Sequence, residues 1–115
     1  MKTITENIRQ YVDAWNTKDE HEVLAGFQQC LSPGCTYNDK NTPTVTGLQS
    51  ITDLVMDSYK KFPGREFSLT SEPECFDNKG RYYWRVTIPG QGEKNCMDFI
   101  EFDADNKITH IVGFV

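Results

Sequence analysis

The chain has 115 residues, with 12 basic and 17 acidic side chains, a formal net charge of −5 at pH 7 and 37% hydrophobic residues. This length supports one hydrophobic core, so we expect a single domain over residues 1–115. The acidic balance and the absence of a Lys/Arg cluster argue against nucleic acid as a partner. No apolar run approaches the roughly 20 residues that cross a bilayer, and no signal-peptide core follows Met1. We therefore expect a cytoplasmic protein that does not bind membranes.

The cysteines give no sign of a disulfide framework or a metal site. A core of this size needs no covalent bridge, so we expect reduced and mostly buried thiols. Zinc requires ligands at short spacings, which neither the cysteines nor the two histidines provide. We expect no metal. The residues concerned are Cys30, Cys35, Cys75, Cys96, His21 and His110.

Two helices are predicted at the start of the chain. Thr3 and Glu6 have the spacing of a capping box, and apolar residues then recur at a 3.6-residue period, which predicts a helix over residues 4–17. Asp19 is placed to cap a second helix. We expect that helix to end at Ser32-Pro33-Gly34.

A short strand and a third helix are predicted next. Residues 35–39 alternate in polarity and are expected to form a strand that ends in a polar loop. Thr46 and Gln49 have the spacing of another capping box, followed by apolar residues at helical spacing. Pro63-Gly64 is expected to close this helix.

After Gly64 the hydrophobic period changes from 3.6 to 2, which predicts strands separated by polar turns. Pro73 is expected to mark an edge or a bulge. The order of elements predicts an α+β domain with its helices packed on one face of a curved sheet. The expected strands cover residues 65–76, 81–89, 93–103 and 107–115.

Both faces of the later strands carry apolar side chains, and three helices cannot cover both faces of so small a sheet. We therefore expect a homodimer that pairs sheet against sheet. The outer face is expected to carry Tyr83, Met97, Phe99 and Ile111. The inner face is expected to carry Tyr82, Trp84, Ile100, Phe102, Val112 and Phe114.

Three polar side chains fall where the pattern predicts burial. Tyr11 lies in the apolar stripe of the first helix, Asp39 shares a strand face with Tyr37, and Asp98 shares one with Ile100. A carboxylate on an apolar face is costly unless it is paired, hydrogen-bonded or protonated. These positions therefore favour a functional site.

Each of these residues also has a structural interpretation. Asp39 could end its strand and bind the backbone of the following loop, and Asp98 could lie at a sheet edge. Tyr11 could be a core residue with a satisfied hydroxyl. His110 could line a pocket or be a buried histidine of the core.

Four segments, Gln10–Asp19, Cys35–Asp39, Thr46–Ile51 and Met97–Ile108, resemble the nuclear transport factor 2-like superfamily, and within it SnoaL-like and ketosteroid isomerase-like proteins. The resemblance covers nearly the whole chain. It implies a cone-shaped α+β barrel in which three N-terminal helices pack on a strongly curved, mostly antiparallel sheet. It also implies a deep apolar pocket and a homodimer.

The resemblance carries functional roles onto three positions. Tyr11 matches the oxyanion tyrosine of the isomerase, Asp39 its catalytic base and Asp98 its protonated carboxylic acid. For that role desolvation must raise the pKa of Asp98 well above about 3.9. The expected chemistry is isomerisation or cyclisation by proton abstraction next to a carbonyl, without a cofactor.

The ligand is expected to be an apolar small molecule, held in one cavity with the three residues named above. The alternative is a noncatalytic module of the same fold, which binds a small ligand or serves as a dimeric interaction scaffold. The remaining side chains expected to line the cavity are Trp15, Tyr37, Trp84, Ile100 and His110.

Overall fold

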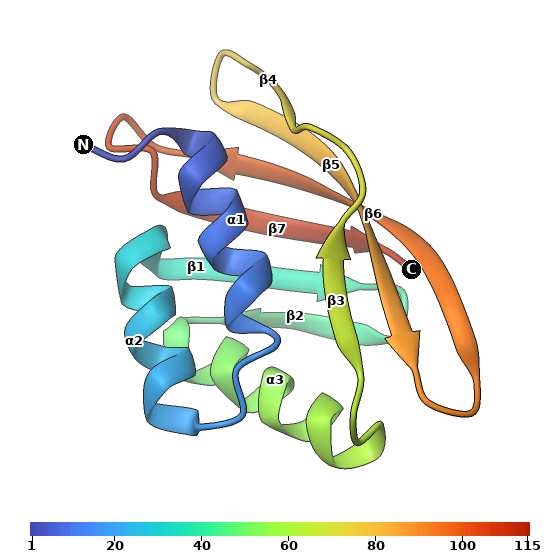
Figure 1. Ribbon diagram of the computed structural model, residues 1–115. Coiled ribbons are helices and arrows are strands. Elements are labelled where there is room, and N and C mark those ends of the chain that lie inside the picture. The colour runs from blue at the N-terminus through green and yellow to red at the C-terminus, as the bar shows by residue number, and fades with distance from the viewer.

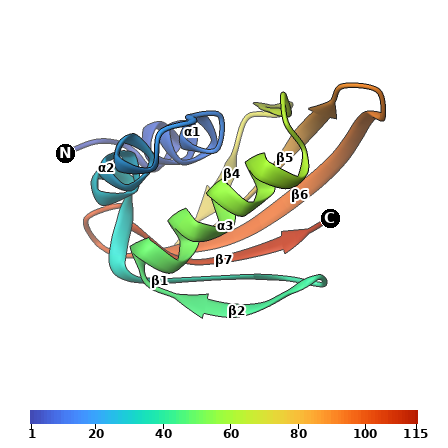
Figure 2. The same cartoon turned by 90° about the horizontal axis from the view of Figure 1, so that it is seen from below.

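The computed structural model describes residues 1–115 and places three helices on one face of a seven-stranded sheet (Figure 1). Seen from below, the helices form one layer and the strongly curved sheet forms the other (Figure 2). The helices are α1 (Ile4–Ala14), α2 (Glu20–Cys30) and α3 (Leu48–Lys61). The strands are β1 (Leu31–Asp39), β2 (Thr42–Thr46), β3 (Glu66–Leu69), β4 (Glu74–Phe76), β5 (Lys79–Ile88), β6 (Gly92–Phe102) and β7 (Ile108–Phe114).

The strands follow the order β2-β1-β7-β6-β5-β3, and β4 pairs with β5 beyond the end of β3. Every pair is antiparallel except β1 with β7, which is parallel. The predicted α+β architecture and mostly antiparallel sheet are confirmed. The sheet stays open, because β2 and β3 are free edges and do not pair with each other.

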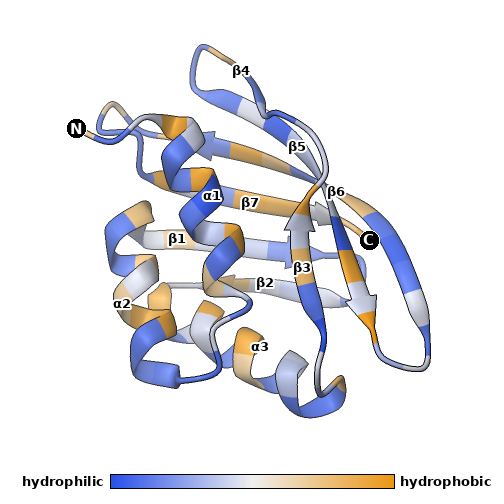
Figure 3. Ribbon diagram, in the orientation of Figure 1, coloured by the Kyte–Doolittle hydropathy of each residue, from blue (hydrophilic) through white to orange (hydrophobic).

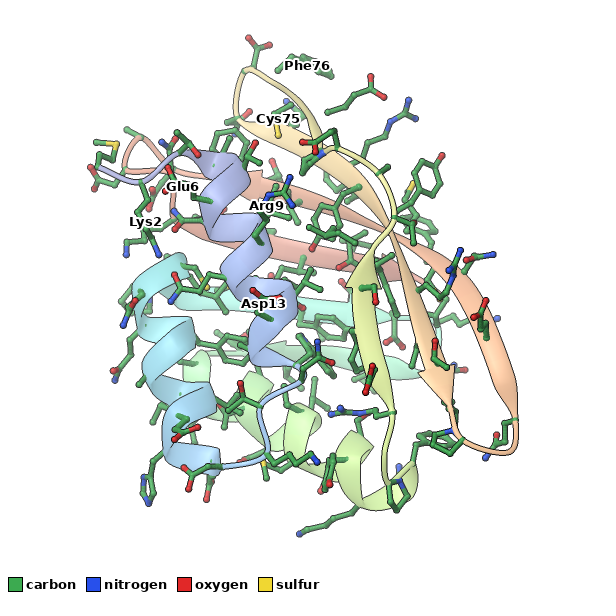
Figure 4. The ribbon with its side chains drawn as sticks, viewed as in Figure 1. Lys2, Glu6, Arg9, Asp13, Cys75 and Phe76 are labelled. Atoms are coloured by element: carbon green, nitrogen blue, oxygen red, sulfur yellow. The ribbon has the colours of Figure 1, made fainter.

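The first two helices begin where their caps predict. The Thr3 hydroxyl accepts from the Glu6 N–H, and the Glu6 carboxylate accepts from the Thr3 N–H, so the capping box is confirmed. The Asp19 carboxylate accepts from the N–H of Glu22 at the start of α2. Figure 4 shows Glu6, Arg9 and Asp13 on the side of α1 that is turned away from the sheet.

The capping box predicted for the third helix is wrong. Gly47 occupies the N-cap position with a φ of 98°, which only glycine adopts readily, and it forms no side-chain cap. Thr46 is the last residue of β2. The Gln49 amide binds Glu20 and Asp53 instead of the helix start.

Three predicted boundaries also differ from the structure. β1 follows α2 directly at Leu31, and a register shift between Leu31 and Thr36 accommodates the segment predicted as a break. β2 lies where a polar loop was predicted, because pairing with β1 orders it. The strand predicted over residues 65–76 is two strands, interrupted at residues 70–73, where Pro73 lacks the N–H that a ladder requires.

The predicted alternation of β7 is wrong by one position. A bulge where Phe102 pairs with Ile108 resets the strand, so Ile111 pairs with Ile100 on the buried inner face. Val112 and Phe114 therefore point outward, opposite the predicted face. The apolar residues of the outer face are Tyr83, Met97, Phe99, Val112 and Phe114.

The core lies between the helices and the inner face of the sheet and is centred on Ile8, Val23, Phe27, Ile51, Val55 and Ile100. Cys30, Cys35 and Cys96 are buried free thiols, as predicted, whereas Cys75 on β4 is exposed (Figure 4). None of the helices is long and apolar enough to span a membrane.

Candidate functional site

A cavity of about 400 Å³ lies between the helices and the concave inner face of the sheet. Trp15, Phe67 and Trp84 form an aromatic wall, with ring centroids 5.4 Å apart in each successive pair. Twelve of the 21 lining residues are hydrophobic, which suits an apolar ligand. The apolar and aromatic part includes Tyr11, Val12, Trp15, Leu54, Phe67, Trp84, Val86 and Ile88.

Two carboxyl groups line this cavity on either side of a glycine. Asp39 on β1 pairs with Gly113 on β7, and Gly113 pairs with Asp98 on β6, so all three share the inner face. A Cβ on residue 113 would lie 3.3 Å from the Asp39 Cβ and 3.4 Å from Asp98 Oδ1. It would also lie 3.3 Å from the Tyr37 hydroxyl, so the missing side chain of Gly113 leaves room for Asp39, Tyr37 and Asp98 on the same face.

Asp98 is nearly buried, with 4% of its surface exposed. The Tyr82 hydroxyl donates to its Oδ2 (2.8 Å) and the Trp84 indole N–H donates to its Oδ1 (2.9 Å). Burial raises the pKa of Asp98 to about 6, with the charge of Asp39 acting in the same direction and the two hydrogen bonds opposing it. The direction of this shift is the one expected for a desolvated carboxyl.

Asp39 is held on both sides. Its Oδ2 accepts from the Tyr37 hydroxyl (2.7 Å), and its Oδ1 accepts from the backbone N–H of Asn41 (2.8 Å). Asp39 therefore combines the local backbone contact of a strand-end aspartate with a place in the cavity wall. Burial and the bond to Asp39 raise the pKa of Tyr37, so its hydroxyl stays protonated and donates.

Tyr11 is both a core residue and a cavity residue. Only 2% of it is exposed, and its ring stacks on Phe27 with centroids 5.7 Å apart. Burial raises its pKa well above the usual value, and the charge of Asp98 adds to this effect. Its hydroxyl is therefore a neutral hydrogen-bond donor in the cavity wall.

The structure brings together most, but not all, of the residues that were expected to share one cavity. Trp15, Tyr37 and Trp84 line it, whereas Ile100 is fully buried in the core and does not reach it. The expectation for His110 is wrong, because the β7 bulge turns it to the exposed outer face. There it lies beside Glu101, with 3.8 Å between Nδ1 and Oε1.

Sequence reasoning missed three residues of the site. Tyr82 was expected on the inner face but not as a partner of Asp98, and the Gly113 position was not singled out. Arg65 also lines the cavity, although only 4% of its surface is exposed. The position of Gly113 inside a strand is the one sequence signal related to this close approach, and it is too common to identify the site by itself.

No three His, Cys, Asp or Glu side chains converge in a way that would hold a metal ion. Near Asp39 and Asp98 the polar groups of the cavity are carboxyls, phenols and an indole N–H, and the lining also includes the basic side chains of Lys61, Arg65 and Lys94. Such a set can donate hydrogen bonds to an oxygen and accept a proton from carbon. The chemistry that the arrangement supports is therefore proton transfer.

The model of the SnoaL-like domain matches residues 8–111 of the chain. A putative isomerase of the SnoaL-like family from Agrobacterium tumefaciens is 26% identical, with a TM-score of 0.87 over 98% of this chain and 97% of that one. A putative SnoaL-like polyketide cyclase from Jannaschia sp. is 13% identical, with a TM-score of 0.76 over 96% and 83% of the two chains. An NTF2-like protein of unknown function from Exiguobacterium sp. is 16% identical, with a TM-score of 0.74 over 94% and 96%. No curated protein sequence matches the chain.

Proposed function

Because the chain belongs to the SnoaL-like domain family, we propose that it is a cofactor-independent isomerase or cyclase acting on a mostly apolar molecule that contains a carbonyl group. The observation that carries the proposal is that two carboxyls, Asp39 and Asp98, lie on either side of Gly113 and line the same mostly apolar cavity. The similarity to the Agrobacterium protein described as a putative isomerase supports the same reaction class.

In the proposed mechanism Asp39 removes a proton from the carbon next to the carbonyl. Its two hydrogen bonds, from Tyr37 and from the Asn41 N–H, fix the direction of the carboxylate. A base held in this way loses little freedom when the substrate arrives. Asp39 then returns the proton to a different carbon, which gives isomerisation. Attack of the enolate on a second carbonyl gives cyclisation instead.

Negative charge develops on the carbonyl oxygen as the proton leaves, and two groups are placed to stabilise it. Tyr11 donates from its neutral hydroxyl, and protonated Asp98 donates from its carboxyl. With a pKa of about 6, about a tenth of Asp98 is protonated at pH 7. An apolar ligand that displaces water from the cavity raises this pKa further, and so favours the donor form when substrate is bound.

The experiment is solvent deuterium incorporation into a planar cyclic enone, followed by NMR. The parent protein should catalyse exchange at the carbon next to the carbonyl, and Asp39→Asn should abolish it because the amide is not a base. Tyr11→Phe should lower the rate about a hundredfold, as expected when one oxyanion donor is lost. Binding of the enone without any exchange by the parent would favour the noncatalytic module instead.

We also propose that the outer face of the sheet pairs with a second copy of the chain. Tyr83 and Phe114 on this face are 48% and 57% exposed, and Met97 lies between them in register. Phe99 and Val112 form the adjacent row. A contiguous apolar surface of this kind is rarely left open to water.

A further inference from the structure

The side chains of the cavity wall change from acidic to apolar to basic along β6. Asp98, Cys96 and Lys94 all line the cavity, because alternate residues of a strand share one face. On β5 the cavity-lining partners of Cys96 and Lys94 are Trp84 and Val86. The wall therefore runs from a carboxyl, past an apolar stretch, to an ammonium group. Asp98 and Lys94 are about 13 Å apart along the strand at its usual rise per residue.

The helix layer supplies a second cation to the same end of the cavity. Lys61, the last residue of α3, lines the cavity, as does Asp57 one turn earlier. Neither Lys61 nor Lys94 belongs to any of the four ion pairs of the chain. Figure 3 shows that hydrophilic residues dominate the first half of β6, where Lys94 lies.

A third cation is buried at this end without a counter-ion. The guanidinium of Arg65 donates to Ser58 Oγ (2.8 Å), the Trp15 carbonyl (2.8 Å) and the Val55 carbonyl (3.0 Å), all of which are neutral. It also packs on the Phe67 ring, 4.8 Å from its centroid. No carboxylate lies within ion-pair distance, and burial lowers the pKa of Arg65. A buried charge is normally paired, so the partner of this one is absent from the chain itself.

We propose that the substrate is an apolar oxo acid that spans the cavity, with its carbonyl at the Asp39–Asp98 pair and its carboxylate at the end formed by Lys61, Arg65 and Lys94. The position of the carbonyl rests on the proposed function, whereas the position of the carboxylate rests on the three cations alone. Asp57 is the only acid at that end, which therefore carries an excess of two positive charges in a chain whose net charge is −5. Such local positive charge attracts an anionic group, although the net charge of the whole molecule is negative.

The proposal is tested with 4′-hydroxybiphenyl-4-carboxylate and its methyl ester. The phenol oxygen stands in for the enolate oxygen, and the carboxylate lies at the opposite end of a rigid apolar frame. The only two tryptophans, Trp15 and Trp84, line the cavity, so quenching of their fluorescence reports binding. The acid should bind roughly 10- to 100-fold more tightly than the ester, as hydrogen bonds to a charged group predict. This preference should fall as salt is added.

Replacing the two lysines by Lys61→Gln and Lys94→Gln should reduce the preference for the acid and leave the part that Arg65 supplies. Both side chains are exposed, so neither change threatens the core. Lys60→Gln removes the same charge from the neighbouring position, which does not line the cavity, and should leave the preference unchanged. Equal binding of acid and ester by the parent, binding of neither, or a preference that both lysine replacements leave unchanged would overturn the proposal.

A fourth variant separates this inference from the proposed function. Asp39→Asn should lose deuterium exchange but keep the preference for the acid, because the cations are untouched. If the parent shows no exchange but still prefers the acid, the proposed reaction is rejected and the proposed carboxylate site is retained. Exchange by the parent without a preference for the acid would support the proposed reaction and reject the carboxylate site.

Discussion

Asp98→Asn should make the protein more stable at neutral pH while making it a poorer catalyst. Burial raises the folded-state pKa of Asp98 from 3.8 to about 6. A raised carboxyl pKa means that the folded state holds its proton more tightly than the unfolded state does. The resulting stability is complete below pH 3.8 and is lost as the pH rises through about 6. A shift of this size corresponds to a cost of about 3 kcal/mol above pH 7.

The asparagine preserves the local contacts. Its oxygen can accept from the Trp84 N–H, and its amide can donate to the Tyr82 hydroxyl, which both donates and accepts. The variant should therefore avoid the cost of a buried charge while keeping one hydrogen bond to each of these neighbours.

The assay is urea unfolding of the parent and the variant at pH 4, 6 and 8. The free energy of unfolding should differ little at pH 4, and the variant should gain up to about 3 kcal/mol at pH 8. Asp13→Asn, on the exposed side of α1, is the matched control and should show no such trend. A variant that is destabilised equally at all three pH values would refute the assignment of a raised pKa to Asp98.

Three further predictions concern packing, assembly and local structure. Gly113→Ala should lower the exchange rate about tenfold, because a Cβ 3.3–3.4 Å from Asp39 and Asp98 forces a shift of a few tenths of an ångström. Gly34→Ala, with nothing within 4 Å of its Cβ, should leave that rate unchanged. Phe99→Asp should convert a dimer to a monomer in sedimentation without a change in the circular dichroism spectrum, and a monomeric parent at micromolar concentration would contradict the proposed dimer. Thr3→Ala should lower the free energy of unfolding by about 1 kcal/mol in urea titrations, and an unchanged value would argue against the capping box in solution.

The sequence predicts the fold where local signals decide the structure. The Thr3 and Asp19 caps and the alternation of β5 and β6 depend on residues within a few positions of each other. The misses depend on distant partners. β2 is ordered by pairing with β1, and the face of His110 is set by a bulge opposite Phe102. No local pattern contains that information.

The candidate site divides in the same way. Tyr11, Asp39 and Asp98 could be identified because each is a polar residue on a face that the pattern predicts to be buried. Gly113 and Arg65 could not, since their importance depends on cross-strand register and on which charges lie nearby in space. A strand glycine and a lone arginine are too common in sequences to be distinguished without the fold.

The most direct test of the central claim is deuterium exchange into a bound planar enone at pH 7, measured side by side for the parent, Asp39→Asn and Asp13→Asn. The parent and the Asp13 variant should show exchange, and the Asp39 variant should show none above the solution background. Exchange by Asp39→Asn at the parent rate would contradict the claim that this carboxyl moves the proton.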